Sequence, residues 1–203
     1  MKIILALVCG IGIAAPIAAA ATDKSSVSTM SNLQVAFNGE SNAHARYLAF
    51  AKKADAEGFR GAASLFRAAA RAEEVHANNH AAVIKEFGGS PVAKLETPVV
   101  KSTRDNLEAA LKGETYERDQ MYPSFIRQAK EEGNAKALRT LTLALTAEVE
   151  HAKLYTEALQ NLERMRSAKL FYVCPVCGFT TAKLDFEACP TTGTPKERFE
   201  QVN

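Results

Sequence analysis

Apolar residues recur every three or four positions through four long segments of the chain, which predicts four amphipathic helices. These segments are rich in alanine, leucine, glutamate, lysine and arginine, all of which favour helix. They cover about residues 31–58, 61–87, 102–133 and 134–167. Ser31 and Gln34 form a possible capping box at the start of the first helix.

The lengths of the connections predict how these helices are arranged. Gly58 and Gly133 mark short turns within two helix pairs, whereas a longer loop with Pro91 and Pro98 joins the pairs. Two helical hairpins linked by one crossover are typical of ferritin-like bundles. We therefore predict an all-α, four-helix, ferritin-like bundle, and assign it to residues 22–168.

The bundle contains one sequence pattern twice. Residues 32–40 recur as residues 106–114, an offset of 74, and both copies end in Gly-Glu. Residues 72–77 recur as residues 147–152, an offset of 75, and both copies contain Glu-x-x-His. Two halves that each supply a lone glutamate and a Glu-x-x-His are the ligands of a carboxylate-bridged di-iron or di-manganese site.

Helix geometry brings the glutamates of each half to one level. Glu40 lies 18 residues before Gly58, and Glu73 lies 15 residues after it. Antiparallel helices with a rise of about 1.5 Å per residue then place the two side by side. Glu114 and Glu148 repeat this spacing to within one residue. Glu40 and Glu73 also follow the apolar rhythm of their helices, and a buried carboxylate needs compensation such as a bound metal. The i, i+3 spacing places His76 and His151 on the same faces.

Three further side chains near these motifs lack a counterpart in the other half. Glu117 lies three residues after Glu114, where the first half has Ala43. We expect an additional inward carboxylate that binds a metal in one oxidation state, although it is alternatively a surface charge. His44 and His80 lie one turn beyond the first-half ligands, and we interpret them as supporting or structural residues.

Two tyrosines indicate an irregularity in the third helix. Tyr47 and Tyr122 correspond at an offset of 75, but Glu40 and Glu114 correspond at 74. The extra residue between Glu114 and Tyr122 predicts a single-turn π-bulge, which Pro123 would favour because it cannot donate a backbone hydrogen bond. Both tyrosines are either core aromatics or hydrogen-bond donors to the metal site.

The helical pattern stops at Lys169, and residues 169–203 form a separate, loop-rich module that is too short for a core of its own. Cys174 and Cys177 form one metal-binding knuckle, but the second knuckle has only Cys189, because Thr192 stands where a fourth cysteine is expected. A four-thiolate iron site is therefore incomplete, and a third iron is doubtful. We expect a disulfide between two of these cysteines or a weak three-cysteine metal site.

These motifs resemble those of rubrerythrins over about residues 30–203. The resemblance rests on Asn-Gly-Glu40, Glu73-Glu-Val-His76, Gly-Glu114-x-x-Glu117, Met-Tyr-Pro123 and Glu148-x-x-His151. It implies a rubredoxin-like module after the bundle, two bound iron ions and reduction of hydrogen peroxide. It also implies a head-to-tail homodimer in which one chain's module lies near the other chain's di-iron site. By the same resemblance, the bridging carboxylates are Glu73 and Glu148, the terminal ligands are Glu40, Glu114 and His151, and the redox-dependent alternatives are Glu117 and His76. The candidate catalytic residues are Glu117, His76, Tyr47 and Tyr122.

The net charge and the N-terminal segment bear on the binding partners and on the location of the protein. The net charge of +2 and the lack of a basic, aromatic-rich patch argue against nucleic acid binding. Residues 1–21 resemble a secretory signal, so we expect a periplasmic protein without a membrane anchor after cleavage; an uncleaved anchor is the alternative.

The leading hypothesis for the function is a peroxidase that receives electrons from an external electron-donor protein. The alternatives are a ferroxidase that handles iron and a thiol-based structural or sensing protein.

Overall fold

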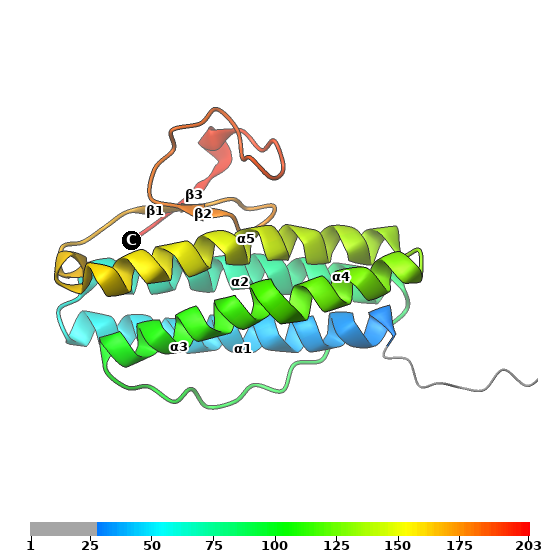
Figure 1. Cartoon of the computed structure of the whole chain (residues 1–203), viewed down its shortest axis with the longest axis horizontal. Helices are drawn as coiled ribbons and strands as arrows, with labels where there is room; N and C mark the ends of the chain where they lie inside the picture. Colours follow the sequence, from blue (N-terminus) through cyan, green and yellow to red (C-terminus); the bar gives the residue numbers. More distant parts are fainter. Residues whose placement is uncertain (1–27) are drawn as a thin grey trace, which may run out of the picture.

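Four helical rods form an antiparallel bundle in the computed structural model, which describes residues 28–203 (Figure 1). The expected signal segment, residues 1–21, lies outside the described residues. The rods are α1 (Thr29–Ala56), α2 (Arg60–Glu86), the continuous α3 (Thr103–Tyr116), η1 (Glu117–Met121) and α4 (Tyr122–Glu131), and finally α5 (Ala135–Gln160). An extended crossover joins α2 to α3. This architecture confirms the prediction of an all-α, ferritin-like bundle.

The helix termini differ from the prediction at both ends of the bundle. Helix α1 begins at Thr29 because the Ser28 side chain accepts a hydrogen bond from the Ser31 backbone N–H, at 3.2 Å. The expected capping box is therefore wrong, and the Gln34 amide donates instead to the Ser90 carbonyl of the crossover, at 2.5 Å. At the other end, α5 stops at Gln160, and the chain tightens into the 3₁₀ helix η2 (Leu162–Arg166).

The predicted π-bulge is confirmed. Residues Glu117–Met121 form the π-helical turn η1, and the backbone N–H of Tyr122 donates to the carbonyl of Glu117, five residues earlier. Pro123 follows at the start of α4, and because it has no N–H it cannot donate to the preceding turn of the continuous rod, which favours the wider π-turn. The extra residue of the second half is thus absorbed inside the third rod.

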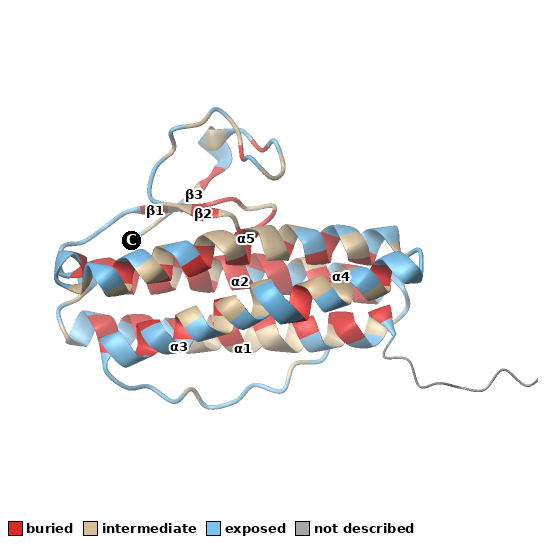
Figure 2. Cartoon of the chain, viewed as in Figure 1, coloured by how far each residue is buried: buried red, intermediate tan, exposed pale blue. Residues whose placement is uncertain are grey.

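Buried positions lie along the helices of the bundle (Figure 2). They include two apolar clusters. One cluster contains the four packed aromatic rings of Tyr47, Phe50, Phe66 and Tyr155. The other contains Leu33, Ile84, Tyr122 and Leu141. The matched spacing of the two halves places the buried glutamates between these clusters, so apolar packing encloses them from both ends of the bundle.

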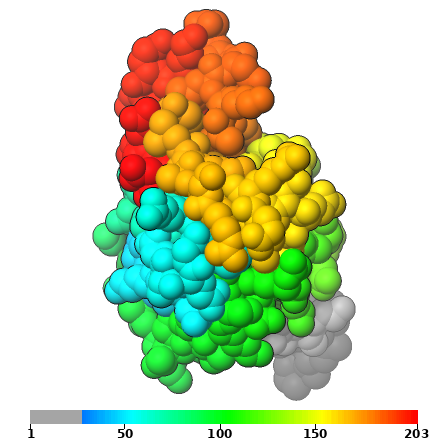
Figure 3. All heavy atoms as spheres, turned by 90° about the vertical axis from the view of Figure 1, so that its left-hand side faces the viewer, coloured from blue at the N-terminus to red at the C-terminus, as the bar shows by residue number. Residues whose placement is uncertain are grey.

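The C-terminal module contains a small antiparallel sheet in the order β2-β1-β3. Its elements are β1 (Phe171–Val173), β2 (Thr180–Thr181), the 3₁₀ turn η3 (Lys196–Arg198) and β3 (Glu200–Val202). The module sits on the α2 and α5 side of the bundle (Figures 1 and 3). Arg71 of α2 holds it there through two hydrogen bonds to the Glu200 carboxylate, at 2.5 and 2.9 Å.

Among residues 28–203, no helix combines the length and the apolar character needed to cross a membrane.

Candidate metal centre

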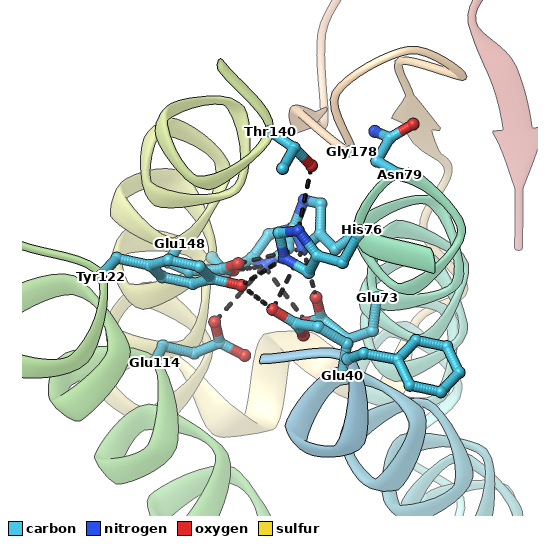
Figure 4. A network of polar contacts seen from close by, with 12 residues as sticks. Glu40, Glu73, His76, Asn79, Glu114, Tyr122, Thr140, Glu148 and Gly178 are labelled. Atoms are coloured by element: carbon cyan, nitrogen blue, oxygen red, sulfur yellow. Dashed lines mark hydrogen bonds and ion pairs between the residues drawn. The ribbon is translucent and has the colours of Figure 1, made fainter. Parts of the chain in front are cut away.

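Two groups of four potential metal ligands lie side by side in the middle of the bundle (Figure 4). The first group is Glu40, Glu73, His76 and Glu148. The second group is Glu73, Glu114, Glu148 and His151. Within each group the ligand atoms lie within 4.8 Å of one another, and every member is buried. Glu73 and Glu148 belong to both groups, which is the position of carboxylates that bridge two metals.

Each histidine turns the same ring nitrogen toward the carboxylates. His76 Nδ1 lies 2.8 Å from Glu73 Oε2 and 3.0 Å from Glu148 Oε1. His151 Nδ1 lies 2.8 Å from Glu148 Oε2 and 3.4 Å from an oxygen of Glu114. The predicted i, i+3 spacing therefore does bring each Glu-x-x-His pair together at the centre.

The polar atoms at this centre fit bound cations. Although these atoms lie close together, oxygens of all four carboxylates and both Nδ1 atoms make no hydrogen bond among the described residues, and all of them are buried. Burial, followed by repulsion from Glu73 and Glu148, raises the pKa of Glu114 to about 8. Buried carboxylates without compensation are costly, and two metal ions would supply both the missing charge and the missing contacts.

Two tyrosines hold the outer glutamates in place. The hydroxyl of Tyr47 donates to Glu114 Oε1 at 2.5 Å, and the hydroxyl of Tyr122 donates to Glu40 Oε1. Each tyrosine thus binds the glutamate of the other half of the repeat. This arrangement is the hydrogen-bonding alternative that the sequence left open, and it fixes the carboxylates from outside the ligand groups.

His80 supports one of these tyrosines. Its Nε2 lies 3.2 Å from the Tyr122 hydroxyl, and its Nδ1 lies 3.0 Å from Thr140 Oγ1. Because the Tyr122 proton is directed to Glu40, His80 Nε2 donates to Tyr122 and Nδ1 accepts from Thr140. His44 faces elsewhere, with Nδ1 at 2.7 Å from the carbonyl of Ala70. Neither histidine belongs to a ligand group.

Glu117 faces the centre from the π-turn without belonging to either ligand group. Its side chain is half-buried. Burial and then repulsion from Glu40 and Glu114 raise its pKa well above the ordinary value. This position is consistent with an additional inward carboxylate, and the redox-dependent role stays a prediction.

The C-terminal module reaches both metal-facing histidines, which the sequence did not reveal. The second ring nitrogen of His76 lies 3.0 Å from the Cys177 carbonyl, and that of His151 lies 3.1 Å from Thr180 Oγ1. The Thr180 hydroxyl donates a hydrogen bond to the carbonyl of Gly178, at 2.9 Å. It therefore accepts from His151 Nε2–H, which leaves Nδ1 free to bind a metal.

Gly178 lies between these two contacts and is constrained by both its backbone and its surroundings. Its φ of +75° suits glycine, and an added Cβ would collide with the His76 ring. The resemblance implied that such a contact joins two chains. In this structure a chain's own module covers its own centre.

The cysteine cluster departs from a four-thiolate site, as the sequence indicated. Cys174, Cys177 and Cys189 are buried free thiols whose sulfurs lie within 4.8 Å of one another. The fourth corner is Thr192, whose Oγ1 lies 3.6 Å from Cys174 Sγ. These residues do not fit the iron of a rubredoxin, which needs four thiolates.

Comparison with known proteins agrees with the geometry of the centre. The family model for rubrerythrin matches residues 31–159. The chain belongs to the rubrerythrin family. Nigerythrin of Nitratidesulfovibrio vulgaris is 41% identical over 173 residues, covering 85% of each chain. Rubrerythrin-2 of Clostridium acetobutylicum is 39% identical over 174 residues, covering 83% of this chain and 93% of the relative.

A solved structure of a rubrerythrin relative supports the same assignment. Nigerythrin in its fully reduced, all-ferrous state is 40% identical and superposes with a TM-score of 0.82, covering 89% of this chain and 90% of that one. Rubrerythrins are di-iron proteins of oxidative-stress defence, and this bundle carries a di-iron site with glutamate and histidine ligand clusters.

Proposed function

We propose that this rubrerythrin is a peroxidase that reduces hydrogen peroxide to water at the di-iron centre of its bundle. The observation that carries the proposal is the sharing of Glu73 and Glu148 by both ligand groups. Two ferrous ions, when bound, supply the two electrons that cleave the O–O bond. One peroxide, two electrons and two protons give two waters, and an external electron-donor protein returns the electrons.

The surrounding residues hold the ligands in a dry, fixed arrangement. We assign Glu73 and Glu148 as bridges, with Glu40, Glu114 and His151 as terminal ligands. Tyr47 and Tyr122 orient the two outer carboxylates through their hydroxyl protons. Burial of the ligands keeps bulk water from the reacting oxygen atoms, which strengthens each electrostatic contact.

His76 and Glu117 are the proposed alternative ligands of one iron. His76 is a member of the first ligand group, whereas Glu117 faces the same region from η1. A π-turn is a common device at functional sites, because it changes the direction of a side chain without ending the helix. The proposal therefore gives the π-turn of the second half a role in metal binding.

The test is peroxide-dependent turnover by iron-loaded protein with an external reductant. We expect Glu148→Ala to lose most iron and turnover, because it removes a carboxylate shared by both ions. Glu150→Ala is the matched control, since this glutamate lies on the same helix and pairs with Lys153 at the surface, at 2.6 Å. A ferroxidase would instead consume ferrous ion stoichiometrically with no need for reductant. That result, or full activity of Glu148→Ala, would overturn the proposal.

We also propose that residues 1–21 direct export to the periplasm and that the mature protein is a homodimer. Because the chain's own module covers its own centre, the head-to-tail arrangement that the resemblance implied is not part of this proposal. N-terminal sequencing of protein from fractionated cells tests the first proposal, because cleavage leaves a new terminus near Thr22. Light scattering of the purified mature chain tests the second. An intact N-terminus in the cytoplasmic fraction, or a monomer at working concentration, would contradict the respective proposal.

A further inference from the structure

The two loops that carry the cysteines keep the backbone geometry of a metal-binding pair. Gly178 N–H donates to the Cys174 carbonyl at 3.0 Å, and Gly193 N–H donates to the Cys189 carbonyl at 2.9 Å. Both glycines have a positive φ, of 75° and 69°. The matching turns place Thr192 at the position that Cys177 occupies in the first loop. The second loop therefore has the backbone geometry of the first, with threonine in place of its second cysteine.

Two distances in the cluster are close to the edges of a tetrahedron of three sulfurs and one oxygen, and the remaining sulfurs lie within 4.8 Å of one another. With metal–sulfur bonds of about 2.3 Å and a metal–oxygen bond of about 2.1 Å, tetrahedral edges are about 3.8 Å for S···S and about 3.6 Å for S···O. The Cys177 and Cys189 sulfurs lie 3.6 Å apart, and Cys174 Sγ lies 3.6 Å from Thr192 Oγ1. A disulfide would need sulfurs about 2.05 Å apart.

Thr194 holds the threonine hydroxyl at this corner. The Thr194 N–H donates to Thr192 Oγ1 at 3.4 Å, and the two hydroxyl oxygens lie 2.8 Å apart. Thr192 can therefore donate its proton to Thr194 Oγ1 and keep a lone pair directed at the sulfurs. Contacts of this kind orient metal ligands and are part of what makes a site selective. Thr194 is itself buried, so water does not compete for these contacts.

We propose that this cluster is a zinc site, with the thiolates of Cys174, Cys177 and Cys189 and the hydroxyl of Thr192 as its four ligands. Zinc accepts thiolate and oxygen ligands in a tetrahedron, and a given site of this type binds it more tightly than ferrous ion. Ferric iron would have only three thiolate ligands in this cluster, instead of the four that stabilise it in a rubredoxin. Because zinc has no redox chemistry, the module carries no electrons and stabilises the fold above the di-iron centre.

The test uses the full chain, stripped of metal under reducing conditions and titrated with zinc. Cobalt serves as the optical probe, since its sulfur charge-transfer band reports only an ion bound by thiolates and ignores the carboxylate centre. We expect one thiolate-bound ion per chain. Thr192→Val should weaken zinc binding at least about tenfold, and Thr192→Ser should restore it by returning the hydroxyl. Thr191→Val is the matched control, because no hydrogen bond of that side chain occurs among residues 28–203.

Several outcomes would overturn this assignment. A ferric-thiolate spectrum from the unaltered protein, with iron in place of zinc, would show that the module is a rubredoxin-type carrier. A loss of two titratable thiols in purified protein would show a disulfide. Zinc affinity unchanged in Thr192→Val would remove the threonine from the ligand set. Thr192→Cys is the converse variant, and should create a ferric-thiolate spectrum when iron is supplied in a reducing cytoplasm.

Discussion

Replacing Thr180 by valine tests whether the C-terminal module positions a ligand of the di-iron centre. Valine keeps the shape of threonine and removes only the hydroxyl that accepts from His151 Nε2, at 3.1 Å. Both side chains are 1% exposed, so no water replaces the lost partner. The imidazole then keeps a buried N–H without an acceptor, and its tautomer and orientation are no longer fixed.

The size of the effect follows from the loss of one such contact. Removing an outer hydrogen bond to a metal-bound histidine typically costs about 10- to 100-fold in metal affinity. That range equals about 1.4–2.7 kcal/mol, which agrees with the cost of about 1–3 kcal/mol for an unsatisfied buried donor. We therefore expect Thr180→Val to lower the iron affinity of the His151 side of the centre by 10- to 100-fold.

The assay is a ferrous titration of the stripped protein, followed by the absorption of the oxidised di-iron centre. Thr180→Ser should recover most of the affinity, because it returns a hydroxyl to the same place. Thr181→Val is the control, since this neighbouring hydroxyl donates to the Lys183 carbonyl within the module, at 2.9 Å. If Thr180→Val binds two irons as tightly as the unaltered protein, or if serine does not rescue it, the positioning role is refuted.

Three further predictions concern the centre and the bundle. Glu73→Ala should lose most of the bound iron, as counted by metal analysis, because Glu73 belongs to both ligand groups. Tyr122→Phe should weaken iron binding by about 1.5–3 kcal/mol in the same titration, since it removes the proton donated to Glu40. Glu57 accepts from the Thr103 hydroxyl and N–H, which lowers its pKa from 4.5 to about 2. Its stabilisation, about 1 kcal/mol because the group is partly exposed, should be complete above pH 4.5 and fade toward pH 2. Urea unfolding of Glu57→Gln should therefore differ from the unaltered protein at pH 7 and converge with it near pH 2.

The bundle and its ligand groups were predictable because the sequence states them twice. A single Glu-x-x-His is common on helix surfaces, but two copies at matched distances from two turns restrict which faces meet. Glu40 and Glu73 reach the same level because each lies a similar number of residues from Gly58. Helical periodicity is a local property, so it can be read without knowing any contact between distant segments.

Contacts between the module and the bundle were not predictable in this way. Thr180 follows the first cysteine loop by three residues, and nothing in its neighbourhood indicates that its hydroxyl meets His151 of α5. The ion pair between Arg71 and Glu200 likewise joins residues 129 positions apart. Such contacts depend on how a loop-rich module docks, and loops have no period that reports which side chains face the partner surface.

The start of α1 was also not predictable from the sequence alone. Ser28 and Ser31 are both plausible N-caps, and local preference does not separate them. The structure selects Ser28, because the N–H of Thr29 donates to the Glu132 carboxylate at the end of α4, at 3.1 and 3.2 Å. The expected partner of Ser31, Gln34, is instead recruited by the crossover. A tertiary contact therefore decided between two local signals of similar strength.

The π-turn explains how the second half tolerates an extra residue without losing the symmetry of the centre. In an uninterrupted α-helix, one inserted residue would rotate Tyr122 by about 100° relative to Glu114 and turn its hydroxyl away from Glu40. The i to i+5 bond from Tyr122 to Glu117 absorbs that rotation. Tyr122 therefore binds Glu40 as Tyr47 binds Glu114, each reaching across to the other half. Glu117 begins this turn, and the first half has Ala43 at the matching position. The insertion thus preserves the shared ligands, whereas the carboxylate of Glu117 comes from a substitution at the position of Ala43 and not from the extra residue.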